Sequence, residues 1–388
     1  MTLKNWLALI GLTFSTFIFN TSEFIPIGLL TDIAKDFQVT EAVAGMIISV
    51  YAWIVMLLSL PLMLIFSNWD LKRLMVAVMA VFVTFQFLSS ASTGYYMLMF
   101  ARIGVACSHS IFWAIVAPLA CRIVPAEKKP TALSMIVTGS AIAMILGMPL
   151  GRVIGLHLGW RMTFLTIGIF SAAILIYLII ALPPVPSRGS FSIKKLPILL
   201  KNRLLVYFFL LTMGIATAYF ECYGYIEPFL KQVVGMSDQS ITSALMVFGV
   251  AGLVGSYIFS KFYSRNPHRF ITICIACMAA CLALLTPLSG LPVIIFAICA
   301  FWGIAATDFN VAFQSEIMRI TPPEGSAVAL SIYSGIFNFG IGTGSFLGGH
   351  VFTHISPSII GYVGSAILVI VLLFWWFIVT PRFHQSFK

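Results

Sequence analysis

The sequence predicts an all-α integral membrane protein with twelve transmembrane helices, arranged as two pseudo-symmetric halves of six. Three observations support this fold class. The 388-residue chain is 60% hydrophobic and only 9% charged, and its apolar runs are long enough to cross a hydrocarbon core of about 30 Å. The polar stretches between these runs are short. The longest of them, residues 183–203, leaves six apolar runs on either side.

Each predicted helix starts after polar or Pro/Gly-bearing residues, whose backbone groups would lack hydrogen-bond partners in lipid. We expect the helices to begin near Trp6, Ala42, Leu74, Tyr95, Thr131, Thr163, Leu204, Ser240, Phe270, Pro292, Glu324 and Ile359. The predicted domains are an N-terminal six-helix bundle at 1–182, a cytoplasmic linker at 183–203 and a C-terminal six-helix bundle at 204–388. Both halves have a basic turn after their second helix and a Gly-rich fifth helix, which indicates a parallel repeat.

Positive charge is distributed unevenly between the predicted loops. With the N-terminus on the cytoplasmic side, most of the 22 Lys and Arg residues fall on that side, and the opposite side receives only Lys35, Arg152, Arg161 and Lys231. This asymmetry predicts that both termini are cytoplasmic. The same asymmetry accounts for most of the formal net charge of +10. We expect the basic loops to contact anionic membrane lipid, and we expect no nucleic acid partner.

No pattern in the sequence favours an enzyme, a cofactor or ATP drive, since Walker, dinucleotide-binding and triad-like motifs are missing. Cys274, Cys277 and Cys281 share one face of an apolar helix. Without a second Cys pair, they are better explained as small packing residues than as metal ligands. We therefore expect no metal site, and we expect the protein to be a monomer.

Glu23 is the strongest functional candidate because it lies deep inside the first apolar run. A carboxyl group in a membrane span is costly and by default indicates function. Thr16, Asn20, Glu23 and Ile27 are spaced four, three and four residues apart, so they share one helix face, which we expect to face the bundle interior. Asn20 is accordingly a candidate substrate contact.

The fourth predicted helix carries a similar stripe, formed by Arg102, Ala106, His109 and Trp113. Arg102 and Glu23 would be natural partners if the first and fourth helices meet. Burial favours a neutral carboxyl group and a nearby guanidinium favours the carboxylate, so motion of these helices could switch proton binding. Glu23 then has three open roles: proton coupling, a fixed ion pair with Arg102, or substrate contact. His109 could relay protons or hydrogen-bond a ligand or a backbone carbonyl, and Trp113 is a candidate substrate contact.

The seventh predicted helix is rich in polar aromatic and acidic residues. Tyr219, Glu221 and Tyr225 are candidate substrate contacts, because aromatic faces stack on sugar rings while phenol and carboxyl groups hydrogen-bond sugar hydroxyls. The alternative is an aromatic belt at the membrane surface. Asn338 and Ser334 share a face of the eleventh predicted helix and are also candidate substrate contacts, although amides in a membrane core can equally join helices. Asp308 could lie near a membrane surface or pair with a distant Arg.

The fifth predicted helix contains Gly139, Gly147 and Gly151 at multiples of four residues, with Pro149 between the last two. This spacing predicts a flat face for close helix packing.

Several motifs resemble a known family of transporters. Residues 20–30, 102–106 and 146–152 resemble the drug/proton antiporter branch of the major facilitator superfamily, and residues 109–113, 225–229 and 334–338 resemble bacterial sugar efflux transporters of the SotB type. The resemblance covers nearly the whole chain. It implies a bacterial inner-membrane antiporter that exports sugars such as arabinose, and thiogalactoside-like inducers, in exchange for protons. It also implies that the Gly139, Gly147, Pro149 and Gly151 segment resists leakage and favours exchange.

The sequence departs from the family in the loop after the second helix. Ser67 and Asn68 stand where the family's Gly-x-x-x-Asp-Arg motif has Asp and Arg. Asp70 is the carboxylate left to replace the gate residue, and the sequence does not decide whether it does. Two other functions stay open: export of drugs or nucleosides, which the 34 Phe and 17 Met residues would suit, and a transporter-like receptor, which the lack of a signalling domain disfavours.

Overall fold

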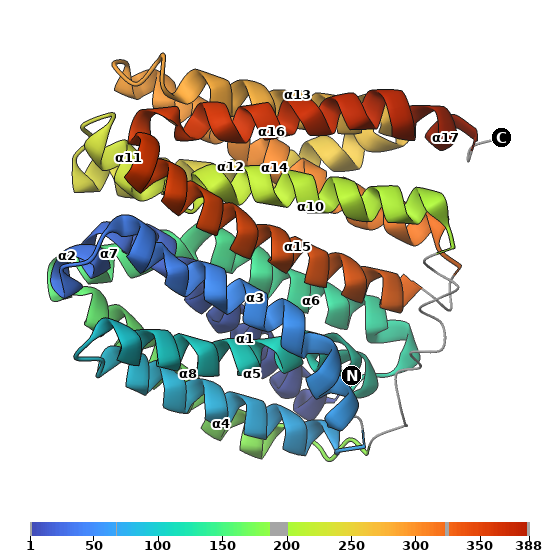
Figure 1. Ribbon diagram of the computed structural model, residues 1–388. Helices are drawn as coiled ribbons and strands as arrows, with labels where there is room; N and C mark the ends of the chain where they lie inside the picture. The colour runs from blue at the N-terminus through green and yellow to red at the C-terminus, as the bar shows by residue number, and fades with distance from the viewer. Residues whose placement is uncertain (1, 67, 187–200, 323–325, 386–388) are drawn as a thin grey trace. The chain divides into compact units, whose positions relative to one another are not determined.

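The computed structural model describes residues 2–66, 68–186, 201–322 and 326–385, and within them it is helical without strands. Eleven helices in these ranges are long and apolar enough to cross a bilayer (Figure 1). A further helix of 25 residues, α15 (Ser326–His350), lies where the eleventh span was predicted. The predicted all-α membrane fold is confirmed. The predicted start at Glu324 and linker residues 187–200 lie outside the described residues.

The chain divides into two compact units, Met1–Val39 with Val50–Phe191, and Thr40–Ser49 with Ser192–Lys388. The start of the second predicted span, Thr40–Ser49, groups with the second unit, which the sequence analysis did not predict. The predicted domain boundaries at 182 and 204 stay a prediction. The first unit contains α1 (Leu3–Gly28), α2 (Leu30–Phe37), most of α3 (Glu41–Ile65), α4 (Leu71–Ser90), α5 (Tyr95–Arg122), α6 (Lys129–Ile142), α7 (Met148–Leu158) and α8 (Trp160–Ala181).

The polar face of α1 is enclosed by neighbouring helices of the first unit. α1 packs against α5, α6, α7 and α8, and α4 packs against α5 and α8. The Thr2 side chain caps the N-terminus of α1 by accepting a hydrogen bond from the backbone N–H of Asn5. Pro26 lies near the C-terminal end of α1, and the helix stops two residues later. Asn20 to Glu23 are therefore buried among these helices, in the last third of α1.

The second unit contains α10 (Arg203–Tyr223), α11 (Ile226–Gln232), α12 (Asp238–Phe262), α13 (Pro267–Leu285), α14 (Pro292–Ile320), α15, α16 (Ile360–Phe374) and α17 (Thr380–Gln385). α10 packs along α15 and α16, α12 packs along α14, and α13 packs along α14 and α16. The predicted seventh span is broken at Gly224 and Tyr225, which separate α10 from α11. The predicted fifth span is likewise interrupted by a π-helical segment, Ala143–Gly147.

Candidate functional site

Glu23 and His109 face each other inside the first unit. His109 Nε2 lies 3.7 Å from Glu23 Oε2, and the side chains are only 2% and 9% exposed. The other ring nitrogen of His109, Nδ1, is 2.7 Å from the Tyr51 hydroxyl group. Glu23, His109 and Tyr51 come from α1, α5 and α3, so three helices meet in one buried chain of ionisable groups. With the Tyr51 hydroxyl donating to Nδ1, the neutral imidazole carries its proton on Nε2, the atom that faces Glu23.

Arg102 is also buried beside this chain, but it binds the backbone of α1. Its Nη1 donates to the Ser22 hydroxyl at 3.1 Å and its Nη2 donates to the Ser22 carbonyl at 3.0 Å. The guanidinium carbon lies 4.6 Å from the ring centroid of Tyr51, a cation–π arrangement. Gln86 donates a further hydrogen bond to the Ser22 hydroxyl. These contacts fix the Arg102 charge next to the chain of Glu23, His109 and Tyr51.

The structure shows no direct Glu23–Arg102 ion pair among the described residues, which was one of the three roles that the sequence left open for Glu23. Among the described residues, the ion-pair contact of Glu23 is with His109, and the recorded hydrogen bonds of Arg102 are with Ser22. The physical reason is the height of each side chain along its helix. Arg102 and His109 share a face of α5 but are separated by about 10 Å along the axis at 1.5 Å per residue. Ser22 and Glu23 are adjacent on α1, so the long Arg102 side chain extends along the bundle to the hydroxyl and carbonyl of Ser22, and the shorter His109 side chain meets the Glu23 carboxyl group directly.

Sequence reasoning missed Tyr51 because it lies in an apolar run of α3 and resembles a packing residue. A buried tyrosine hydroxyl usually has a polar partner, and this rule was the available signal. We expect Tyr51→Phe to slow exchange and to lower stability by about 1 kcal/mol, because the His109 ring loses the hydrogen bond that holds it. Exchange of labelled substrate between reconstituted vesicles, with melting in detergent, measures both effects. Unchanged exchange in Tyr51→Phe would remove Tyr51 from the site.

The other candidates in the first unit lie near this centre. Trp113 contacts His109, with ring centroids 6.0 Å apart. Asn20 is buried and donates from Nδ2 to the Ser140 hydroxyl of α6 at 2.8 Å. Its amide group therefore joins α1 to α6 in this structure. A role in substrate contact for Asn20 or Trp113 stays a prediction.

The predicted glycine face packs closely, and its partner is α1. A side-chain carbon added at Gly139, Gly147 or Gly151 would lie 2.5 Å from an atom of Thr13, Thr21 or Ile25, respectively. Pro149 follows the π-helical segment in the first turn of α7. The helix that carries Glu23 thus rests directly on the backbone of α6 and α7, and larger residues at these glycines would push it away.

Arg152, which follows this glycine face, has an unexpected role. The sequence analysis placed Arg152 in a loop on the non-cytoplasmic side of the membrane. In the structure its side chain is fully buried. Its Nη1 donates to the carbonyl oxygen of Gly28 at 2.5 Å. A cation at a helix C-terminus satisfies carbonyl groups that have no partner within the helix. Arg152 therefore closes the end of α1.

In the second unit, Tyr219 belongs to a buried aromatic cluster with Tyr223, Phe248 and Trp302. Tyr219 and Tyr223 stack with centroids 5.0 Å apart, and both meet the Trp302 ring edge-on at less than 6 Å. These contacts come from α10, α12 and α14. The cluster argues against a membrane-surface belt for Tyr219 and Tyr223, because both side chains are enclosed by helices.

Glu221 and Tyr225 are fully buried. Tyr225 stacks on Phe352 with centroids 5.6 Å apart. Both side chains are enclosed by helices in this conformation, and a role in substrate contact for them stays a prediction. Glycines of α15 lie against both residues, Gly344 and Gly348 against Glu221 and Gly349 against Tyr225.

Asn338 forms a hydrogen bond with the nitrogen of its amide group only. Its Nδ2 donates to the Ser334 carbonyl, one turn earlier in α15, at 3.0 Å. Its Oδ1 is buried without a hydrogen-bond partner, while the side chain of Ser334 is exposed. The sequence left two places open for Asp308, one near a membrane surface and one paired with a distant Arg. The side chain is buried in α14 at 3% exposure. It forms no ion pair with an Arg among the described residues.

Asp70 holds the segment that follows α8. Its Oδ1 accepts a hydrogen bond from the backbone N–H of Arg73, which caps α4, and its Oδ2 accepts one from the N–H of Val185 at 2.8 Å. The N–H of Leu71 donates in turn to the Val185 carbonyl at 2.9 Å. Both carboxylate oxygens of Asp70 are therefore used within the first unit.

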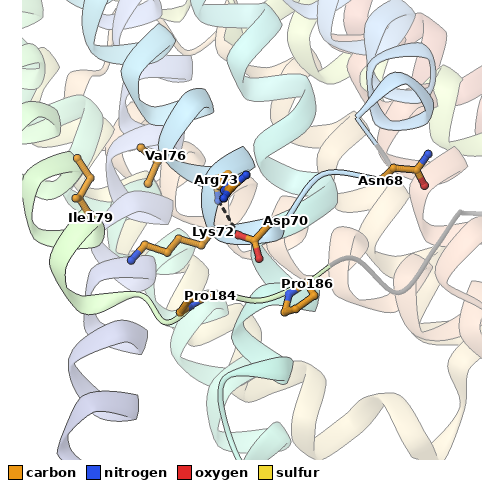
Figure 2. Close-up of a pocket in the computed structure, with 8 residues that line it drawn as sticks. All are labelled: Asn68, Asp70, Lys72, Arg73, Val76, Ile179, Pro184 and Pro186. Atoms are coloured by element: carbon orange, nitrogen blue, oxygen red, sulfur yellow. Dashed lines mark hydrogen bonds between the residues drawn. The ribbon is translucent and has the colours of Figure 1, made fainter.

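A surface cavity of about 830 Å³ adjoins Asp70, and Figure 2 shows the side chains around it. It is lined by Asn68, Asp70, Lys72, Arg73, Val76, Ile179, Pro184 and Pro186. The dashed line in Figure 2 marks the cap between Asp70 and Arg73. The cavity lies at the N-terminal end of α4 and includes none of the buried residues around Glu23.

Apolar spanning helices that enclose a buried chain of ionisable groups define a polytopic membrane protein with a functional site inside its bundle. The chain belongs to the Major Facilitator Superfamily, whose family model matches residues 12–334. The protein is therefore a transporter and not an enzyme. The superfamily suggested by the sequence motifs is confirmed, whereas the drug/proton antiporter branch and the SotB type stay predictions.

Solved structures of three transporters share this fold over almost the whole chain. A bacterial homologue of the human lysosomal transporter Spinster, in an inward-facing and unoccupied conformation, has a TM-score of 0.80 at 14% identity and covers 100% of this chain and 99% of its own. A D-xylose-proton symporter has a TM-score of 0.80 at 13% identity, with 96% and 98% covered. The nucleoside transporter NupG has a TM-score of 0.76 at 15% identity, with 100% of both chains covered. At these identities the likeness concerns the fold alone.

Proposed function

We propose that this protein is a proton-coupled antiporter that exports small sugars, such as arabinose and thiogalactoside-like compounds, across the bacterial inner membrane. The observation that carries the proposal is the buried contact of Glu23 with His109 and Tyr51, next to the Arg102 charge. Both termini are proposed to be cytoplasmic, from the distribution of basic residues. The drug/proton antiporter branch is the proposed place of the chain within its superfamily.

The geometry supports exchange because Glu23 has two alternative partners. A protonated Glu23 is neutral and can stay next to His109 within a closed bundle. A deprotonated Glu23 is attracted to Arg102, whose position is fixed by Ser22, or to a protonated His109. Conformations that change these distances therefore bind a proton with different affinity, and a sugar that prefers the deprotonated form competes with the proton.

The energy of one proton is sufficient for useful export. One charge crossing 100 mV releases about 2.3 kcal/mol, and a tenfold concentration ratio requires about 1.4 kcal/mol. One coupling site therefore supports a sugar ratio of about 50-fold.

The test is uptake of labelled arabinose and of a labelled thiogalactoside into inside-out vesicles with an imposed pH gradient. Vesicles without the transporter and vesicles with a collapsed gradient are the controls. Uptake that requires both the transporter and the gradient supports sugar antiport. The sugar assignment fails if neither compound moves while a nucleoside or a lipophilic cation does.

Export of a nucleoside or an aromatic drug is the second candidate. It is favoured by Trp113, which is half-buried and whose ring centroid lies 6.0 Å from that of His109. Flat aromatic rings stack well on such groups. The same vesicles, loaded with a labelled nucleoside or with a fluorescent lipophilic cation, compare this candidate directly with sugar export.

We expect Asn338→Ala to raise the dissociation constant for the transported sugar about tenfold. Loss of a hydrogen bond that a sugar hydroxyl donates to the amide oxygen corresponds to about 1.4 kcal/mol. Binding measured by calorimetry in detergent checks this value, and Ser331→Ala, one turn before Ser334 on the same helix, serves as a control. An unchanged constant in Asn338→Ala would assign Asn338 to helix packing.

A further inference from the structure

Glu221 is a buried acid that the proposed coupling site does not use. Glu221 is fully buried within the second unit. Neither Oε1 nor Oε2 forms a hydrogen bond of good geometry with a described residue, and the nearest polar group of a neighbouring helix is the backbone of Gly364. The recorded ion pairs of the described residues also do not include Glu221. An ionised carboxylate in such a place would lack both hydration and a compensating charge.

Glycine residues of two neighbouring helices enclose this carboxyl group. A side-chain carbon added at Gly364 of α16 would lie 2.8 Å from Glu221 Oε2. On α15, a carbon added at Gly344 would lie 2.9 Å from the backbone nitrogen of Glu221, and one added at Gly348 would collide with its carbonyl oxygen. The backbones of α15 and α16 therefore lie directly against Glu221, and no room remains for a hydrated carboxylate.

The helices around Glu221 provide no counter-charge. α15 and α16 contain no Asp, Glu, Lys or Arg. The titratable residues of α10 and of the helices that pack on it are Arg203, Tyr207, Tyr219, Cys222 and Tyr223 on α10 itself, Tyr333 and His350 on α15, Tyr362 on α16, His268, Arg269 and the cysteines on α13, and Cys299, Asp308, Glu316 and Arg319 on α14. None of them has a recorded hydrogen bond or ion pair with Glu221.

Other acids of the same unit show what a charged carboxylate receives in this fold. Glu316 is as buried as Glu221, but the Arg319 Nε lies 2.7 Å from its Oε2 and the Tyr263 hydroxyl donates to its Oε1. Asp238 forms an ion pair with Lys231 at 3.1 Å. Glu221 has neither kind of partner, so the form of this carboxyl group that fits its surroundings is the protonated one.

We propose that Glu221 is a second proton-binding site of this transporter, formed by α10 with the glycine faces of α15 and α16. In the conformation described here, the site holds a proton and is closed to water. Exchange of this proton requires α10 to move away from α15 and α16. A role of this proton in the transport cycle rests on the proposed proton-coupled function. The presence of a proton on Glu221 does not depend on that function.

Infrared difference spectroscopy of the reconstituted transporter tests the bound proton. Glu221→Gln keeps the shape and neutrality of a protonated glutamate, so we expect it to fold. At neutral pH, the spectrum of Glu221→Gln should lack the carbonyl-stretch absorbance of one protonated carboxylic acid per molecule. The matched control Asp238→Asn, which replaces an ion-paired carboxylate, should keep that absorbance. An unchanged protonated-acid band in Glu221→Gln overturns the proposal.

Addition of arabinose or a thiogalactoside to the same films tests the use of the proton in the cycle. We expect the Glu221 band to lose intensity or shift on addition of a transported compound. A Glu221 band that stays constant for compounds the vesicles do transport would make Glu221 a fixed, protonated packing residue and overturn its role in the cycle. Failure of the proposed function is seen separately, as gradient-independent transport or as no transport of either sugar.

Discussion

Glu23→Gln is expected to abolish sugar accumulation driven by a pH gradient. With a gradient of one pH unit, the accumulation ratio should fall from about tenfold per proton to about 1, because a neutral amide next to His109 can neither bind nor release a proton. Binding of sugar and passive exchange should persist in part, since Gln keeps the size of Glu. Uptake into inside-out vesicles and exchange between equally loaded vesicles measure the two properties separately.

The matched control is Glu127→Gln, which makes the same chemical change at an exposed acid in the turn before α6. It should transport like the wild type. Full gradient-driven accumulation by Glu23→Gln would remove Glu23 from proton coupling and leave its contact with His109 a structural one.

Arg102→Lys is expected to destabilise the protein by about 2 kcal/mol and to stop transport. Arginine donates simultaneously to the hydroxyl and the carbonyl of Ser22 and lies over the Tyr51 ring. The single ammonium group of lysine cannot make both hydrogen bonds while stacking on the ring, although it keeps the charge. A hydrogen bond to a charged group contributes about 1.5–3 kcal/mol. Denaturation in detergent, followed by near-ultraviolet circular dichroism, measures the loss.

Arg73→Lys is the control, because its side chain is exposed and a conservative surface change is expected to stay within about 0.5 kcal/mol. Equal stability of Arg102→Lys and the wild type would show that the positive charge of residue 102 matters more than its hydrogen bonds to α1.

The membrane fold could be predicted from the sequence because the apolar runs alone specify it. A span must satisfy its own backbone hydrogen bonds in lipid, so a run of sufficient length becomes a helix whatever surrounds it. Most predicted starts agree with the structure for this reason, as at Tyr95 and Pro292, where α5 and α14 begin. Interruptions inside a span were harder to predict. The π-helical segment Ala143–Gly147 depends on how α6 and α7 rest against α1, which a local pattern does not report.

The sequence by itself determined that three polar residues of the first unit would be buried inside the bundle. Glu23, Arg102 and His109 were identified because a polar side chain within an apolar helix must face the interior of a bundle. Helical periodicity gives the direction in which a side chain points, but it does not give the height at which it meets the next helix. Only the tertiary structure decided that Glu23 meets His109, that Ser22 meets Arg102 and that Tyr51 completes the chain. Close contacts such as Gly139 against Thr13 set that height, and they form only when the helices pack.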